Sequence, residues 1–257
     1  MLNYVRKGRG EPLVLIHGIG SHWQMWSPVL DRLAAERDVL AVDLPGFGRS
    51  PALDVEPTVA ALADAVSDLA ASQGMVRPHV GGNSLGGGIA LELARTGRAR
   101  SATGLSPIGF AHGREQPYGV AVLKASRALA RGLGPALDPP LRTALGRTLV
   151  IGHLIGRPWR VPAEDAIRAT HDLAAAPAFD ATLPHVISWT WRHGDLDVPV
   201  TIGWGTRDML LIPRQGRRAR RRMPGADHVW LRGCGHVPTW DDPEQIATVL
   251  LAGSRGG

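Results

Sequence analysis

Short apolar runs bounded by turn-forming residues alternate with stretches of helical periodicity along most of this chain. Runs that are apolar throughout are typical of strands in a parallel sheet, which is covered on both faces. We expect strands at residues 12–16, 39–42, 79–80, 102–105, 200–204 and 228–231. Helices are expected at residues 26–35, 59–71, 85–95 and 243–251, the last one capped by Asp242. The alternation predicts an α/β fold with a mostly parallel sheet flanked by helices.

One long stretch interrupts this alternation. Residues 108–195 contain no convincing strand, and their helical patterns are separated by proline and glycine. These patterns lie at residues 118–133, 141–155, 163–176 and 182–191. We therefore predict a helical insertion, residues 108–195, in a single core formed by residues 1–107 and 196–257. Disorder is expected only for the tail after Ala252.

The composition of the 257 residues excludes several classes of protein. A hydrophobic fraction of 44% with 20% charged residues is typical of a globular chain and not of a disordered one. The single cysteine, Cys234, can form neither an internal disulfide nor a cysteine-based zinc site. The chain has no run of membrane-spanning length, and its first residues lack the apolar core of a signal peptide. We expect a soluble cytoplasmic protein.

Basic residues outnumber acidic ones, 29 to 23, which leaves a net charge of +6. A positive balance can favour nucleic acid or an anionic surface as partner. Nearly all of these residues are arginine, however, as the codons of a GC-rich genome favour, and we expect no nucleic-acid partner. A cluster within residues 214–222 is expected to be a solvated helix face, with an anionic partner as the alternative. Its members are Arg214, Arg217, Arg218, Arg220, Arg221 and Arg222.

The pentapeptide Gly82-Asn83-Ser84-Leu85-Gly86 follows a short expected strand and opens an expected helix. This is the setting of a nucleophile elbow, a sharp turn that holds a serine in a strained conformation. The residues two positions before and after the serine must then be nearly free of side chain, as Gly82 and Gly86 are. A glycine-rich helix start with an incidental serine is the alternative.

A second glycine-rich segment, Gly18-Ile19-Gly20, follows the strand expected at residues 12–16. A loop in this place can supply a backbone N–H to a developing oxyanion. We expect the N–H groups of Ile19 and Leu85 to be the two donors, with Gly20 as a weaker choice than Ile19. Gly18 and Gly20 are also candidate substrate-binding residues.

Taken in order, these segments resemble the α/β-hydrolase family. Residues 43–50 are similar to the family's turn after the next strand, residues 204–208 to the stretch that carries the acid of the triad, and residues 233–236 to the loop that carries the histidine. The resemblance covers nearly the whole chain outside the insertion and implies the α/β-hydrolase fold. The chain begins at what resembles the family's second strand, so we expect seven strands.

The resemblance implies a catalytic triad of Ser84, Asp208 and His236, in the family's chain order. In that triad the serine attacks, the histidine is general base and acid, and the aspartate orients the histidine. Asp195 and Asp197 precede the strand at 200–204, whereas Asp208 follows it, at the edge where catalytic loops leave the strands. The chemistry expected is hydrolysis of carboxylic esters through an acyl-enzyme, with no cofactor and no metal.

Several alternatives stay open at this point. A serine at position 84 argues against the aspartate-nucleophile relatives, the haloalkane dehalogenases and epoxide hydrolases. The same triad also serves carbon–carbon bond, lactone, thioester and perhydrolysis reactions. A basic binding module without catalysis is a third possibility.

The helical insertion resembles the cap domain of the family. We expect it to enclose a small-molecule ester with an apolar acyl or aryl group. Candidate pocket residues are Trp159, Trp189 and Trp191. The sequence does not determine the natural substrate or the oligomeric state.

Overall fold

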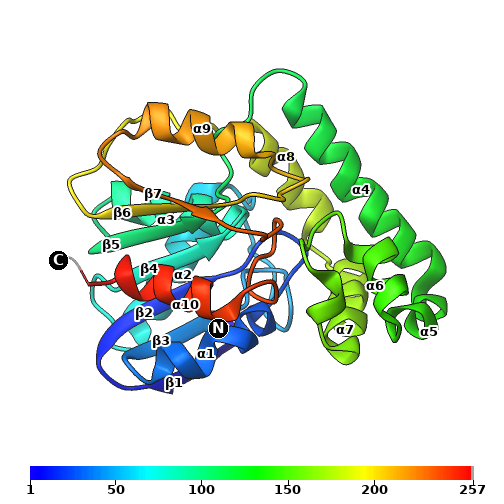
Figure 1. The fold of residues 1–257 in the computed structure, drawn as a ribbon. Coiled ribbons are helices and arrows are strands. Elements are labelled where there is room, and N and C mark those ends of the chain that lie inside the picture. Colours follow the sequence, from blue (N-terminus) through cyan, green and yellow to red (C-terminus); the bar gives the residue numbers. More distant parts are fainter. Residues whose placement is uncertain (256–257) are drawn as a thin grey trace.

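The computed structural model describes residues 1–255, and within these residues seven strands form one sheet (Figure 1). Their order across the sheet is β1-β3-β2-β4-β5-β6-β7. β1 pairs antiparallel with β3, and every other pairing is parallel. The predicted mostly parallel seven-stranded sheet is confirmed. The strands are β1 (Tyr4–Gly8), β2 (Glu11–Ile16), β3 (Arg37–Val42), β4 (His79–Asn83), β5 (Ser101–Leu105), β6 (Val200–Gly205) and β7 (Asp227–Leu231).

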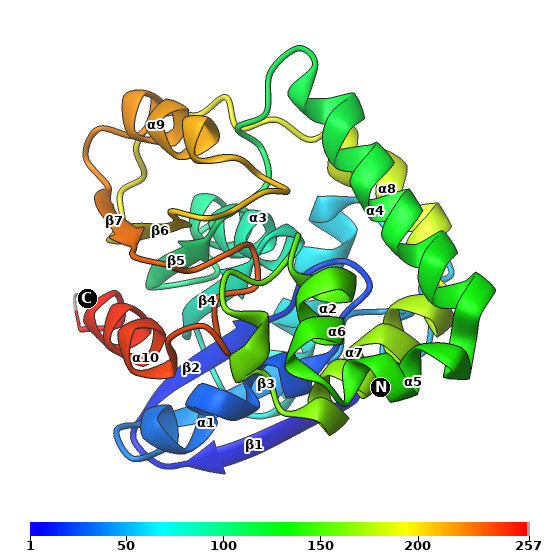
Figure 2. The same cartoon turned by 45° about the vertical axis from the view of Figure 1, so that its right-hand side comes forward.

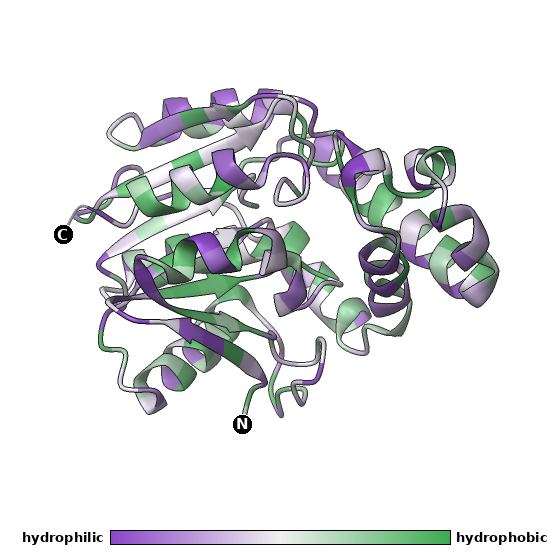
Figure 3. Ribbon diagram, turned by 60° about the horizontal axis from the view of Figure 1, so that its bottom comes forward, coloured by the Kyte–Doolittle hydropathy of each residue, from purple (hydrophilic) through white to green (hydrophobic). Residues whose placement is uncertain are grey.

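Both faces of the sheet are covered because successive strand residues point to opposite sides. In β2, Leu13 and Leu15 pack with one helical layer, and Val14 and Ile16 pack with the other. The first layer contains α1 (Ser27–Ala34) and α10 (Pro243–Ala252). The second contains α2 (Val59–Ser72), α3 (Leu85–Arg95) and α9 (Pro213–Arg222). Figure 3 shows hydrophobic residues frequent along the strands in the middle of the sheet.

The sequence pattern missed some strand residues for simple reasons. β1 carries no apolar run, because three of its five residues are exposed. β4 extends from the expected residues 79–80 to Asn83 through two glycines, which are rare in strands. Asp242 caps α10 as expected, its carboxylate accepting the N–H of Gln245 at 3.1 Å.

The tail after α10 is ordered further than expected. Ser254 is 1% exposed, and its hydroxyl accepts a hydrogen bond from the Arg37 guanidinium at 3.1 Å. The expectation of disorder after Ala252 is therefore wrong for this residue, because the Arg37 side chain reaches across to hold it. Residues 256 and 257, to which that expectation also applied, lie outside the described residues.

Five α-helices lie between β5 and β6, together at one end of the sheet (Figures 1 and 2). A continuous helix at 141–155 was expected, but α6 is shorter, because the side chain of Thr143 caps a new helix there by accepting the N–H of Gly146. None of the helices within residues 1–255 is long and apolar enough to cross a membrane. The five are α4 (Glu115–Leu133), α5 (Asp138–Leu141), α6 (Ala144–Ile151), α7 (Ala163–Ala175) and α8 (Phe179–Ser188).

Candidate active site

Ser84 lies in the sharp turn between β4 and α3, with a backbone φ of 57° and ψ of −114°. A non-glycine residue rarely has a positive φ, and such strain is concentrated at functional sites. The turn leaves no room for side chains on either flank. A Cβ on Gly82 would lie 2.1 Å from the carbonyl oxygen of Gly86, and a Cβ on Gly86 would lie 2.1 Å from that of Ile16. The two glycines therefore permit the turn that presents Ser84.

His236 and Asp208 form a buried pair after neighbouring strands. The Nδ1 atom of His236 lies 2.9 Å from the Oδ2 atom of Asp208. The other carboxylate oxygen of Asp208 accepts the N–H groups of Leu210 at 2.9 Å and Leu211 at 2.8 Å. Asp208 is thus fixed by its own loop, and it leaves the Nε2 atom of His236 for other partners. Asp195, a rival acid by type, instead accepts the N–H of Gly225 at 2.9 Å.

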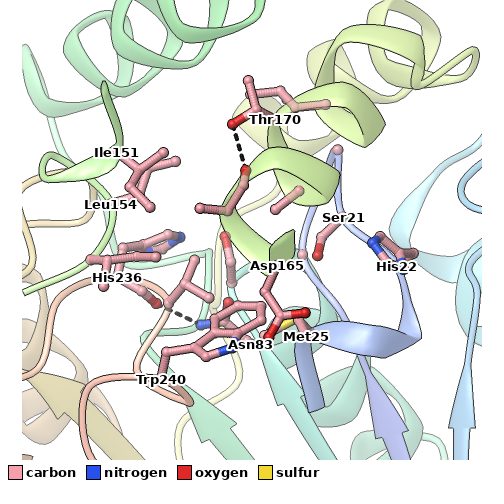
Figure 4. Close-up of a pocket in the computed structure, with 18 of the residues that line it drawn as sticks. Ser21, His22, Met25, Asn83, Ile151, Leu154, Asp165, Thr170, His236 and Trp240 are labelled. Carbon is pink, nitrogen blue, oxygen red and sulfur yellow. Dashed lines mark hydrogen bonds between the residues drawn. The ribbon is translucent and has the colours of Figure 1, made fainter. Parts of the chain in front are cut away.

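Ser84 and His236 line one cavity of about 120 Å³. The cavity lies between the loop after β2 and the helices α4, α6 and α7. In Figure 4, His236 and Trp240 lie on one side of it, with Ser21 and His22 on the other. The expected residues Gly18, Ile19 and Gly20 line this cavity as well.

Two backbone N–H groups are available beside Ser84. Leu85 is the first residue of α3, and the first N–H groups of a helix have no acceptor within the helix. Ile19 belongs to the loop after β2 and lines the cavity. Within residues 1–255, neither N–H group has a hydrogen-bond acceptor. Both groups are therefore free to receive an anionic oxygen, which the positive end of the helix also favours.

A second, smaller cavity of about 50 Å³ is also lined by Ser84. Ile19 and Leu123 line both cavities, as do Ser84 and Leu210. Trp189, one of the expected pocket residues, lines the smaller cavity. Ser84 thus stands at the junction of two compartments that differ in volume.

Two of the expected pocket residues lie elsewhere. Trp159 is 50% exposed in a short 3-10 helix, and Trp191 is 1% exposed in the core, where its Nε1 donates to the carbonyl of Gly194 at 3.0 Å. Neither Trp159 nor Trp191 is among the described residues that line the two cavities beside Ser84. The expectation for Trp191 fails because α8 ends at Ser188 and the chain turns to extended backbone at Trp189.

Sequence reasoning missed two side chains that position the His236 loop. The amide of Asn83 donates to the carbonyl oxygens of His236 at 2.8 Å and Leu105 at 3.0 Å. The buried carboxylate of Asp241 accepts the N–H groups of Gly235 at 2.7 Å and Gly156 at 3.0 Å. Asn83 could have been suspected from its place beside Ser84, but nothing local distinguishes Asp241 from other aspartates.

Similarity to known proteins identifies the family to which this chain belongs. A family model described as the alpha/beta hydrolase family matches residues 13–249. The chain belongs to the α/β-hydrolase family. It is 29% identical to an uncharacterized protein of Mycobacterium tuberculosis (strain H37Rv) over 259 residues, which is 95% of this chain and 75% of that protein.

Two further proteins are similar to this α/β-hydrolase over nearly its whole length. The pimeloyl-[acyl-carrier protein] methyl ester esterase of Neisseria meningitidis serogroup B (strain MC58) is 28% identical, covering 96% of this chain and 94% of that protein. A solved thermophilic esterase from Thermogutta terrifontis has a TM-score of 0.76 at 22% identity, covering 98% of this chain and 92% of that one. The second likeness shows the shared fold.

Two histidines of this α/β-hydrolase lie near Ser84 in different settings. Burial lowers the pKa of His17 to about 4, and its Nε2 accepts the N–H of Leu44 at 2.8 Å, so this ring is neutral and structural. His22 lines the larger cavity, and its Nε2 pairs with the carboxylate of Asp172 on α7. Burial acts to lower the pKa of His22, but the hydrogen bond and charge of Asp172 outweigh it, so the net shift is upward.

The arginine cluster on α9 divides into two groups. Arg214 and Arg218 pair with the buried carboxylate of Glu115 at 2.9 and 2.8 Å, and Arg222 donates to the carbonyl oxygen of Trp191 at 3.1 Å. These three attach α9 to neighbouring segments. Arg217, Arg220 and Arg221 are exposed and form no ion pair within residues 1–255, and Arg214 is exposed as well although it pairs with Glu115. A solvated basic face is therefore smaller than the sequence suggests.

Proposed function

We propose that this α/β-hydrolase cleaves carboxylic esters through an acyl-enzyme intermediate on Ser84. The observation that carries the proposal is the meeting, at one cavity, of a serine held at positive φ and a histidine paired with a buried aspartate at 2.9 Å. A serine hydroxyl is a weak nucleophile near neutral pH and needs such a base.

In the acylation step, the Oγ atom of Ser84 attacks the ester carbonyl carbon while the Nε2 atom of His236 takes the hydroxyl proton. Asp208 holds the tautomer in which Nδ1 carries hydrogen and stabilises the imidazolium that forms. The carbonyl oxygen becomes an oxyanion, which accepts the N–H groups of Ile19 and Leu85. When the tetrahedral intermediate collapses, the carbon–oxygen bond to the alcohol breaks and His236 returns the proton to that oxygen.

In the deacylation step, water replaces the alcohol. His236 takes a proton from the water as its oxygen attacks the carbonyl carbon of the acyl-enzyme. The same N–H groups stabilise the second oxyanion, and the bond to Ser84 breaks as the serine oxygen recovers its proton from His236. The products are a carboxylic acid and an alcohol, and the enzyme needs neither a cofactor nor a metal for this route.

The linings of both cavities support an apolar acyl or aryl substrate. Aliphatic side chains from the helices between β5 and β6 form much of each wall, including Leu123, Leu173 and Val186. Such linings favour burial of apolar substrate surface. The similar protein of Neisseria meningitidis is a methyl ester esterase, which agrees with this reaction class.

The test is hydrolysis of p-nitrophenyl acyl esters of increasing chain length by the wild type and by Ser84→Ala. We expect turnover in the wild type and a loss of kcat on the order of 10⁵-fold in the variant, because the nucleophile is gone. A fluorophosphonate should label the wild type and not the variant. A folded wild type that neither turns over esters nor takes the label would overturn the proposal. Thioester and lactone substrates compared in the same assay would reveal a different preferred bond.

A further inference from the structure

One residue that lines the smaller cavity beside Ser84 has a buried side-chain amide with no hydrogen-bond partner among the described residues. Gln215 on α9 lines this cavity, and its side chain belongs to a residue that is 1% exposed. Within residues 1–255, neither its Nε2 nor its Oε1 has a hydrogen-bond partner. Buried polar groups are nearly always hydrogen-bonded, so an amide left in this state is costly.

Two of the other polar side chains of the smaller cavity are already engaged. Glu115 accepts hydrogen bonds from Arg214 and Arg218, and Gln116 donates to the carbonyl oxygen of Ile187 at 3.2 Å. The remaining wall is largely aliphatic, with Trp189 among its members. Gln215 is the side chain of this compartment whose donor and acceptor are both buried and unpaired within residues 1–255.

The position of His236 decides which part of an ester enters which cavity. This step rests on the proposed function. His236 must reach the oxygen of the leaving alcohol to return a proton to it, and His236 lines the larger cavity. The alcohol therefore occupies the larger cavity. The acyl chain extends from the same carbonyl carbon into the smaller cavity, toward Gln215.

We infer that the preferred acyl group carries an uncharged group that both donates and accepts hydrogen bonds, a carboxamide or a hydroxyl, which pairs with Gln215. A glutamine amide has an N–H donor and a C=O acceptor. A ligand group that pairs with both must therefore accept one hydrogen bond and donate another. An acyl carboxylate can only accept hydrogen bonds, so it would leave the Oε1 atom of Gln215 without a donor. An anionic acyl chain is therefore disfavoured.

The experiment compares p-nitrophenyl esters of succinamic, glutaramic and adipamic acids with their isopropyl isosteres, the 4-methylpentanoate, 5-methylhexanoate and 6-methylheptanoate. Each pair differs only in replacing a terminal carboxamide with a branched alkyl group of similar shape. For the wild type, we expect kcat/KM for the amide to exceed that for its isostere by at least about 10-fold at one chain length. A site built to hydrogen-bond a substrate group discriminates against an analogue that leaves the buried polar group of the protein unpaired. The corresponding half-ester carboxylates should be slower than the amides.

The variant Gln215→Leu removes the amide and keeps the side-chain bulk. We expect it to reverse the preference, so that the alkyl ester becomes the faster member of each pair. Its melting temperature should rise, because a buried unpaired amide is replaced by an apolar group. Gln24→Leu makes the same substitution in the larger cavity, where Gln24 pairs with His22, and it should leave the amide-to-alkyl ratio unaltered.

Three results would overturn the inference. The first is an amide-to-alkyl ratio of kcat/KM near one at every chain length. The second is an unchanged ratio in Gln215→Leu. The third is a lower melting temperature of that variant, which would indicate a structural role for Gln215. If Ser84 takes a fluorophosphonate and apolar esters are hydrolysed without an amide preference, only the inference about Gln215 fails. If Ser84 takes no label and no ester is hydrolysed, the proposed function fails together with it.

Discussion

The side-chain amide of Asn83 donates a 2.8 Å hydrogen bond to the backbone carbonyl of His236. The residue that precedes Ser84 in the chain therefore holds the loop that carries His236, across a separation of 153 residues. The relative position of serine and histidine depends on this bond. In a triad mechanism, a shift of the base by a fraction of an ångström lowers the rate.

We predict that Asn83→Leu lowers kcat for p-nitrophenyl esters by about 10- to 100-fold and changes KM less. The leucine has a similar size but cannot donate, so the His236 loop loses its attachment. Steady-state kinetics provides the measurement. Asn3→Leu is the matched control, because Asn3 makes its side-chain hydrogen bond to Asp43 at 2.7 Å instead. Equal kcat values for Asn83→Leu and the wild type would contradict the prediction.

Gly82→Ala should destabilise the fold by at least about 2 kcal/mol, because its Cβ would overlap the backbone of the elbow. The nearest atom, the carbonyl oxygen of Gly86, would lie 2.1 Å away. Urea unfolding followed by circular dichroism measures the change. Gly132→Ala in α4 is the control, since a Cβ there has nothing within 4 Å. That variant should gain up to about 1 kcal/mol from helix propensity. Similar effects at both positions would argue against a crowded elbow.

The pair between His22 and Asp172 should make stability depend on pH. Folding raises the pKa of His22 because the effect of Asp172 exceeds that of burial. The contribution is therefore fully present below the unfolded pKa of about 6.5 and is lost as the pH rises through the folded pKa. We expect Asp172→Asn to lower the free energy of unfolding by about 1 kcal/mol near pH 5.5 and by less near pH 8.5.

Thermal melts across this pH range compare Asp172→Asn with the wild type. Asp138→Asn is the control, because Asp138 pairs with His171, whose side chain is 42% exposed. Exposed pairs contribute little, so this variant should follow the wild-type pH profile. A difference between Asp172→Asn and the wild type that stays constant with pH would rule out His22 as the titrating group.

Cys234 should be inert toward thiol reagents in the folded protein. Burial, followed by the charges of Asp241 and Asp242, raises the pKa of its thiol to about 12, and the side chain is buried. The thiolate is the reactive form, and it is scarce at pH 8. Titration with Ellman's reagent should detect no thiol in the native state and one per chain in guanidinium chloride. Rapid labelling of the native protein would show that the loop opens.

The local sequence determined the parts of this protein that depend on neighbouring residues. Residues 82–86 predict the turn at Ser84 because only glycine tolerates the crowding two positions away. The alternation of apolar runs and helical stretches predicts the sheet and its flanking helices. Asp208 and His236 became candidates through the resemblance of their segments to the α/β-hydrolase family, and the place of Asp208 after its strand favoured it over Asp195 and Asp197.

Tertiary structure decided what depends on distant partners. His22 meets Asp172, and the Asp241 carboxylate joins the backbone of Gly235 to that of Gly156, although no local pattern marks either contact. The place of Trp191 also depends on tertiary structure, because α8 ends at Ser188 and the Trp191 ring then packs in the core. Gln215, whose amide has no partner among residues 1–255, lines the smaller cavity because α9 packs beside it. Propensity and crowding act over a few residues, whereas burial and pairing are set by the packing of the whole chain.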